Sequence, residues 1–150
     1  MRTFTALRDL AALEGQELGV SDWVAVGQPR IDEFAHATGD AQWIHVDPVR
    51  AAAGPFGTTV AHGFLTLSLL PELAAAAFRI ADVRVGVNYG LDRVRFPAPV
   101  PVDSRLRAAC LLRRFEPLEG GAQLTMTVTI EREGGAKPVC VAEWITRHFV

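Results

Sequence analysis

The segment AHGFLTLSLLPELAAAAFRI, residues 61–80, decides the fold. Helical spacing places apolar side chains on nearly every side of it, and a helix that is hydrophobic all round is normally enclosed by other elements. The pattern therefore predicts one long, buried helix. Pro71 lies inside the segment and predicts a kink or a break, because proline cannot donate a backbone hydrogen bond.

The second half of the chain reads as β-strands. Apolar and polar residues alternate from Val83 to Tyr89, and the alternation slips after Gly90, which predicts a bulge. Three further strands are expected over 105–115, 123–131 and 139–149. In the second of these, four apolar side chains face one way and three threonines face the other: Leu124, Met126, Val128 and Ile130 against Thr125, Thr127 and Thr129.

The first sixty residues mix short elements. Residues 1–20 predict a weak helix with Leu7, Leu10 and Leu13 on one face, and 23–26 predict a strand. Short helices are expected over 29–38, where Gly39 is a typical stop, and over 48–53, where Asp47-Pro48 is a typical start.

These elements predict an α+β fold in a single domain, residues 1–150, with an antiparallel sheet curled around one buried helix. Such a sheet has an edge strand. Dimerisation by extension of the sheet is therefore expected.

Composition excludes several functional classes. Fifteen basic and seventeen acidic residues give a net charge of −2, too balanced for a nucleic-acid-binding protein. No Cys/His cluster has metal-ligand spacing, so no metal is expected, and Cys110 and Cys140 are expected to be small buried hydrophobes. With neither a leader-like hydrophobic run nor a membrane-spanning one, the expected location is cytoplasmic.

The stretch FAHATGDAQWIHVDP, residues 34–48, holds the candidate chemistry. Asp40 and His45 on one loop can orient a water molecule and move its proton. The alternative is a turn-capping carboxylate and a core histidine. At His62-Gly63 the backbone N–H can stabilise an oxyanion, although Gly63 could also serve only close packing.

The stretch TGDAQWIHVDPVRAAAGPFGTTVAHGFLTLSLLPEL resembles the hydratase signature of MaoC-like proteins, which are small hot-dog domains, and the flanking sequence is similar to their NodN-like branch. The resemblance implies an (R)-specific enoyl-CoA hydratase, or a dehydratase of 3-hydroxyacyl thioesters, acting as a homodimer. The substrate is an acyl-CoA or acyl-carrier-protein thioester. Coenzyme A enters only as part of that substrate, and no separate cofactor is expected.

Carried over by position, the resemblance makes Asp40 and His45 the pair that holds the water and Gly63 the oxyanion donor. The expected substrate-binding residues surround them in the sequence or follow the central helix: Trp43, His62, Phe64, Asn88 and Tyr89. Cross-strand packing explains Tyr89 equally well.

Two features depart from the family pattern. Gln42-Trp43 replaces the usual Asn-Pro, so the bulky Trp43 is expected to narrow or line the acyl tunnel, and Pro71 stands about where some hydratases carry a polar residue. Two alternatives remain: an acyl-CoA thioesterase of the same fold and a non-catalytic acyl-binding dimer. Glu72 lies after Pro71, late in the helix for attack on a thioester.

Overall fold

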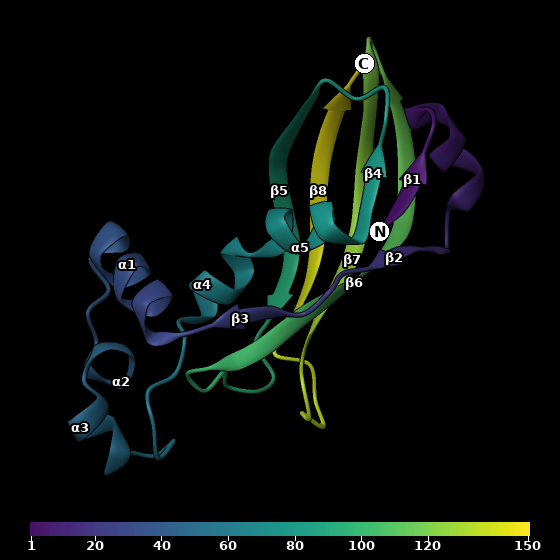
Figure 1. Ribbon diagram of the computed structural model, residues 1–150. Coiled ribbons are helices and arrows are strands. Elements are labelled where there is room, and N and C mark those ends of the chain that lie inside the picture. The colour runs from purple at the N-terminus through teal and green to yellow at the C-terminus, as the bar shows by residue number, and fades with distance from the viewer.

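An antiparallel sheet forms the main layer of the protein, whose computed structural model describes residues 1–150 (Figure 1). Its strand order is β2-β6-β7-β8-β5, and β3 pairs with β6 beside β2. The strands are β2 (Glu17–Val20), β3 (Val24–Val26), β5 (Val85–Arg95), β6 (Ser104–Leu118), β7 (Gly121–Arg132) and β8 (Cys140–Phe149). The antiparallel sheet expected from the sequence is confirmed.

Two consecutive helices, α4 (Gly63–Ser68) and α5 (Leu70–Ala77), follow one another along one side of the sheet (Figure 1). Leu65, Leu70 and Leu73 from these helices join Leu124 and Met126 from β7 in one core of 29 buried residues. Burial of this apolar surface is the main force that holds helices to sheet. None of the helices combines the length and hydrophobicity needed to cross a membrane.

The predicted long helix is broken at its proline. The first helix ends at Ser68 and the second begins at Leu70, so that Pro71 lies in the first turn of α5. Proline is tolerated there because the N–H groups of a first turn have no intrahelical acceptor. The segment buries most of its apolar side chains as predicted, but as two short helices, and Phe64 is exposed. Residues 78–80, predicted as the end of the helix, form the strand β4 (Phe78–Ile80) instead.

The strand predictions agree with the observed pairing. In β7 the side chains alternate between buried and half-buried along the strand, with the buried set including Leu124, Met126 and Val128. The pairing of β5 with β8 shifts between Asn88 and Gly90, where the sequence predicts a bulge.

The helix predicted over 1–20 is wrong. Arg2–Phe4 form β1, which pairs in parallel with β4 (Phe78–Ile80), and Glu17–Val20 form β2 against β6. Only Leu7–Leu13 are helical, as the 3-10 helix η1. A 3-10 helix has three residues per turn, so it also brings leucines spaced by three onto one face; Leu7 and Leu10 are buried. The other residues of this segment form strands because they pair with strands far away in the sequence, and the local pattern of residues does not reveal such pairing.

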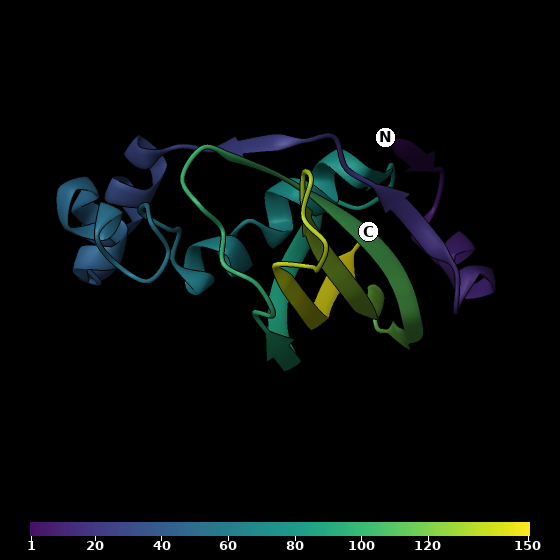
Figure 2. The same cartoon turned by 90° about the horizontal axis from the view of Figure 1, so that it is seen from below.

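A small helical segment lies to one side of the sheet (Figures 1 and 2). It contains α1 (Gln28–Thr38), α2 (Trp43–Val46) and α3 (Pro48–Ala52). The first and third match the predicted helices closely, and Asp47 caps α3 by accepting a hydrogen bond from the Arg50 N–H at 3.0 Å. The short helix α2, which carries His45, was not predicted.

The two cysteines lie in the sheet. Both Cys110 and Cys140 are fully buried, as expected, and burial raises the pKa of their thiols to about 12 and about 11. These thiols are protonated at neutral pH and therefore unreactive.

Gly19 of β2 is expected to be essential to the packing of the sheet against α5. A Cβ atom at this position would lie 2.5 Å from the backbone carbonyl oxygen of Ala77, closer than real Cβ contacts allow. Replacing Gly19 by Ala should lower the free energy of unfolding by about 1–3 kcal/mol, because the backbone must shift. Chemical denaturation measures this. Gly90→Ala is the control, since open space surrounds Gly90; equal stability of the two variants would contradict the prediction.

Candidate active site

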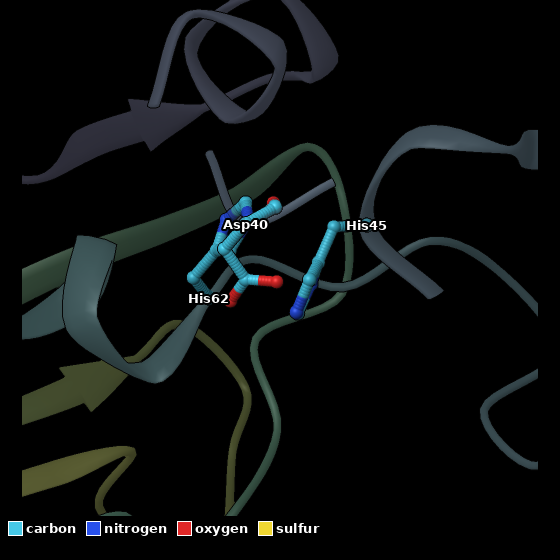
Figure 3. A group of neighbouring side chains, drawn as sticks. All are labelled: Asp40, His45 and His62. Atoms are coloured by element: carbon cyan, nitrogen blue, oxygen red, sulfur yellow. The ribbon is translucent and has the colours of Figure 1, made fainter. Parts of the chain in front are cut away.

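Three polar side chains that are distant in the sequence meet where the helical segment joins α4 (Figure 3). They are Asp40, on the loop after α1, His45 on α2, and His62 immediately before α4. One side-chain nitrogen or oxygen atom from each lies within 4.8 Å of the other two. The structure thus brings together the predicted pair, Asp40 and His45, and adds His62 to it.

The end of α1 places Asp40. Gly39 adopts a left-handed conformation with φ 80°, and its N–H binds the Ala35 carbonyl at 2.8 Å, which ends the helix as predicted. Asp40 then lies on a turn, where its side chain is exposed and accepts only a long hydrogen bond from the Gln42 N–H at 3.5 Å. Its carboxylate therefore keeps acceptor capacity for a ligand.

His45 is buried, with 7% of its surface exposed. Its Nδ1 lies 2.6 Å from the Val60 carbonyl oxygen. Because a carbonyl only accepts, Nδ1 carries the proton and Nε2 has a free lone pair. Burial lowers the pKa of His45, and the hydrogen bond to Val60 partly opposes this; the neighbouring His62 lowers the pKa further and Asp40 raises it. His45 is thus held neutral, as an acceptor.

Gln28 binds the backbone of His45. Its side-chain Nε2 donates to the backbone carbonyl of His45 at 2.7 Å, and its Oε1 accepts from the hydroxyl of Thr59 at 2.6 Å. Since Thr59 is 1% exposed, Gln28 also satisfies a buried hydroxyl. Sequence reasoning missed this residue, because a glutamine before a helix-starting proline has no pattern that indicates a contact with His45.

His62 is 2% exposed and connects the other two groups. Its Nε2 lies 2.8 Å from the backbone carbonyl oxygen of Asp40, so Nε2 carries the proton. Its ring stacks on that of His45, with 3.8 Å between centroids and 25° between planes. Nδ1 is buried and has no hydrogen-bond partner.

These three residues are of the types that bind transition metals. Ligating nitrogens must point at one ion in the planes of their rings. Because the His45 and His62 rings are stacked and nearly parallel, an ion at bonding distance in the plane of one ring would lie outside the plane of the other. This arrangement suits hydrogen bonding to a small molecule better than coordination of a metal.

Gly63 begins α4 directly after His62. Its N–H has no acceptor within the helix, since it belongs to the first residue. A Cβ atom here would lie 3.1 Å from Cδ2 of Phe96, so the glycine also allows close packing of that ring. Next to it lies a mainly apolar cavity of about 300 Å³, lined by Ile44, Val60 and Phe96 among others. Both predicted roles of Gly63, packing and an open N–H, are compatible with this geometry.

The other predicted substrate-binding residues make their recorded aromatic contacts outside this cluster. Trp43 packs against Gly54 and under the guanidinium of Arg50, whose Cζ is 4.5 Å from the centroid of the indole. Phe64 is 69% exposed and contacts Phe96 edge to face.

Asn88 and Tyr89 lie on the edge strand β5 and line a cavity of about 370 Å³ with Pro71 and Trp144. The ring of Tyr89 is covered by the guanidinium of Arg147, whose Cζ is 3.4 Å from its centroid. In a single chain, these two residues do not join the cluster of Asp40, His45 and His62.

The titration of His45 tests this electrostatic arrangement. Its pKa should lie below the ordinary value of about 6.5. Asp40→Asn should lower the pKa further, because it removes the negative charge that favours the imidazolium. NMR of the imidazole resonances between pH 4 and 8 measures both values. Asp47→Asn, a change of the same type at the cap of α3, is the control; a rise of the pKa in Asp40→Asn would refute the arrangement.

Comparison with known proteins agrees with this architecture. Residues 9–133 match the MaoC like domain. The chain is 57% identical over 149 residues to 3-hydroxyacyl-thioester dehydratase Z of Mycobacterium tuberculosis (strain ATCC 25618 / H37Rv), covering 99% of each chain. It is 48% identical to Nodulation protein N of Rhizobium leguminosarum bv. viciae over 145 residues, which cover 94% of this chain and 89% of that protein.

The (R)-hydratase of A. caviae, described as involved in PHA biosynthesis, shares the fold, with a TM-score of 0.68 and 22% identity over 89% of this chain and 94% of that one. The antiparallel sheet with its central helices is thus a hot-dog fold. The extent of the domain match and the identity to full-length relatives place this chain in the MaoC-like domain family.

Proposed function

We propose that this protein adds water to trans-2-enoyl thioesters and, in the reverse direction, removes water from 3-hydroxyacyl thioesters. The observation that carries the proposal is the pairing of Asp40 with His45, whose Nε2 is left free by the bond from Nδ1 to Val60. A carboxylate and a neutral imidazole side by side accept the two protons of one water molecule. That arrangement activates a water molecule as a nucleophile.

The proposed reaction uses these groups in a fixed order. Asp40 accepts a proton from the water while His45 orients it, and the oxygen bonds to C3 of the enoyl chain. Negative charge then develops on the thioester carbonyl, where the Gly63 N–H donates a hydrogen bond. The proton taken from water is returned to C2, so that H and OH are added across the double bond and the protein is unchanged.

The relatives support the same chemistry. The most extensive match reported above is to a protein named for dehydrating 3-hydroxyacyl thioesters, and a protein of the same fold is named as an (R)-hydratase. The likeness to the latter suggests the (R) configuration for the 3-hydroxyacyl compound. We infer a CoA or carrier-protein thioester as substrate, with its chain near the cavity beside Gly63.

A thioesterase reaction is less well supported. The only acidic residue on the central helices, Glu72, is bound by the guanidinium of Arg30 on α1. A carboxylate engaged in an ion pair is a weaker nucleophile than a free one, and Glu72 is absent from the residues that line the cavity beside Gly63.

We further propose that two copies pair through β5. This strand ends the sheet, so the backbone groups along its outer edge have no partner strand. Most of its apolar side chains are exposed, with Val85 at 53%, Tyr89 at 55% and Leu91 at 42%. An exposed apolar edge favours pairing with another strand, and a second copy offers an identical one about a twofold axis.

The loss of enoyl absorbance with crotonyl-CoA and longer trans-2-enoyl-CoAs tests the reaction. The unaltered protein should hydrate at least one of them. Asp40→Asn and His45→Ala should each lower kcat/KM by about 100-fold or more, because each removes one acceptor of the water.

Asp47→Asn is the matched control for Asp40→Asn and should keep full activity. If neither CoA nor carrier-protein enoyl thioesters react, or if both variants of the pair stay fully active, the proposed function is wrong.

The dimer is tested by light scattering after size-exclusion chromatography. The protein should elute as a dimer, and Val85→Lys combined with Leu91→Lys should give monomers, because charged lysines on an edge strand oppose pairing. Val49→Lys, on the exposed surface of α3, is the control and should leave the dimer intact. A dimer that survives both lysines on β5 would rule out this interface.

A further inference from the structure

We propose that His62 is a positioning residue that holds Asp40 and His45 in register with each other and with the N–H of Gly63. The inference rests on the hydratase reaction proposed above, and it gives His62 a role different from the substrate contact expected from the sequence. His62 directly precedes Gly63 in the chain. Three observations carry the inference: a hydrogen bond to the loop of Asp40, a stacked contact with His45, and the burial of His62 itself.

The first observation concerns the loop that carries Asp40. Within that loop the hydrogen bonds that Asp40 itself makes are long, at 3.4 Å from the Asp40 N–H to Thr38 Oγ1 and 3.5 Å from the Gln42 N–H to Asp40 Oδ1. The bond from His62 Nε2 to the Asp40 carbonyl is 2.8 Å and comes from 22 residues away. It is thus the short hydrogen bond that fixes an exposed loop to the buried start of α4.

The second observation concerns the ring of His62. It lies between two aromatic neighbours, His45 on α2 at 3.8 Å and Phe34 on α1 at 5.0 Å between centroids. The imidazole of His45 is therefore held from two directions, by the Val60 carbonyl in its plane and by His62 on its face. A ring held in this way has little freedom to rotate away from the water.

The third observation is the burial of His62 itself. At 2% exposed, with Nε2 engaged and Nδ1 enclosed, it offers no surface for a substrate. Core packing alone does not explain a histidine, because an apolar ring would fill the same space without leaving Nδ1 unsatisfied. Donating to Asp40 while stacking on His45 requires both a ring and an N–H, and His62 supplies both.

Two variants separate these contributions. His62→Gln keeps an N–H donor near the place of Nε2 but loses the ring, whereas His62→Phe keeps a ring but loses the donor. The matched controls are His36→Gln and His36→Phe, since His36 is exposed on α1. All variants are compared in kcat and KM for enoyl-CoA hydration and in thermal denaturation.

The expected result is a loss of kcat by about 10–100-fold in both His62 variants, with KM changed by less than about threefold, because small displacements of catalytic groups slow the reaction more than they weaken binding. A rise in KM with unchanged kcat would overturn the inference and restore a substrate-binding role. Retention of kcat within about twofold in both variants would overturn it as well. Should one variant fail to fold, the other carries the test.

A second readout needs no substrate. Because His62 lowers the pKa of His45, its replacement by Phe should raise the midpoint of the His45 titration measured by NMR, and broaden or shift the amide resonance of residue 41, which follows the carbonyl that His62 binds. An unchanged titration and unchanged loop resonances would overturn the inference. This readout distinguishes failure of the positioning role from failure of the proposed reaction, since it is independent of activity.

Discussion

The four residues from Val60 to Gly63 are the constraint on which the site depends. The Val60 carbonyl holds His45 at 2.6 Å, and the Val60 N–H binds the Ile44 carbonyl at 3.0 Å. Ala61 is fixed to the loop before β6 by the bond from its N–H to the Val100 carbonyl at 2.8 Å. His62 and Gly63 follow at once. A single short run of extended chain thus joins the helical segment, the sheet and the central helices.

This arrangement explains how an exposed carboxylate and a buried imidazole form one unit. Asp40 is exposed on a loop and its carboxylate accepts only a long hydrogen bond, while His45 is enclosed and neutral because burial disfavours its charged form. The difference is useful in the proposed reaction. The exposed carboxylate of Asp40 can accept a proton from water, whereas the neutral imidazole of His45 orients that water through its free lone pair.

The sequence alone predicted the elements whose structure is determined by neighbouring residues in the chain. Gly39 and Asp47-Pro48 mark helix ends by backbone conformation and capping, and the alternation in 123–131 follows from burial of one face of a strand. The family signature brought Asp40, His45 and Gly63 into one hypothesis. The helix prediction for the first twenty residues failed because β1 and β2 form by pairing with β4 and β6, which lie more than sixty residues away in the sequence.

The same distinction separates the parts of the site that could be predicted from those that could not. Asp40 and His45 are five residues apart, so their proximity is a local property of one loop. The bonds from Gln28 to the His45 carbonyl and from His62 to the Asp40 carbonyl use backbone acceptors, which every residue possesses and no sequence pattern marks. Positioning groups of this kind are set by the fold alone, because their partners are defined by place in space and not by residue type. A sequence therefore reveals the side chains that take part in the chemistry more readily than the side chains that position them.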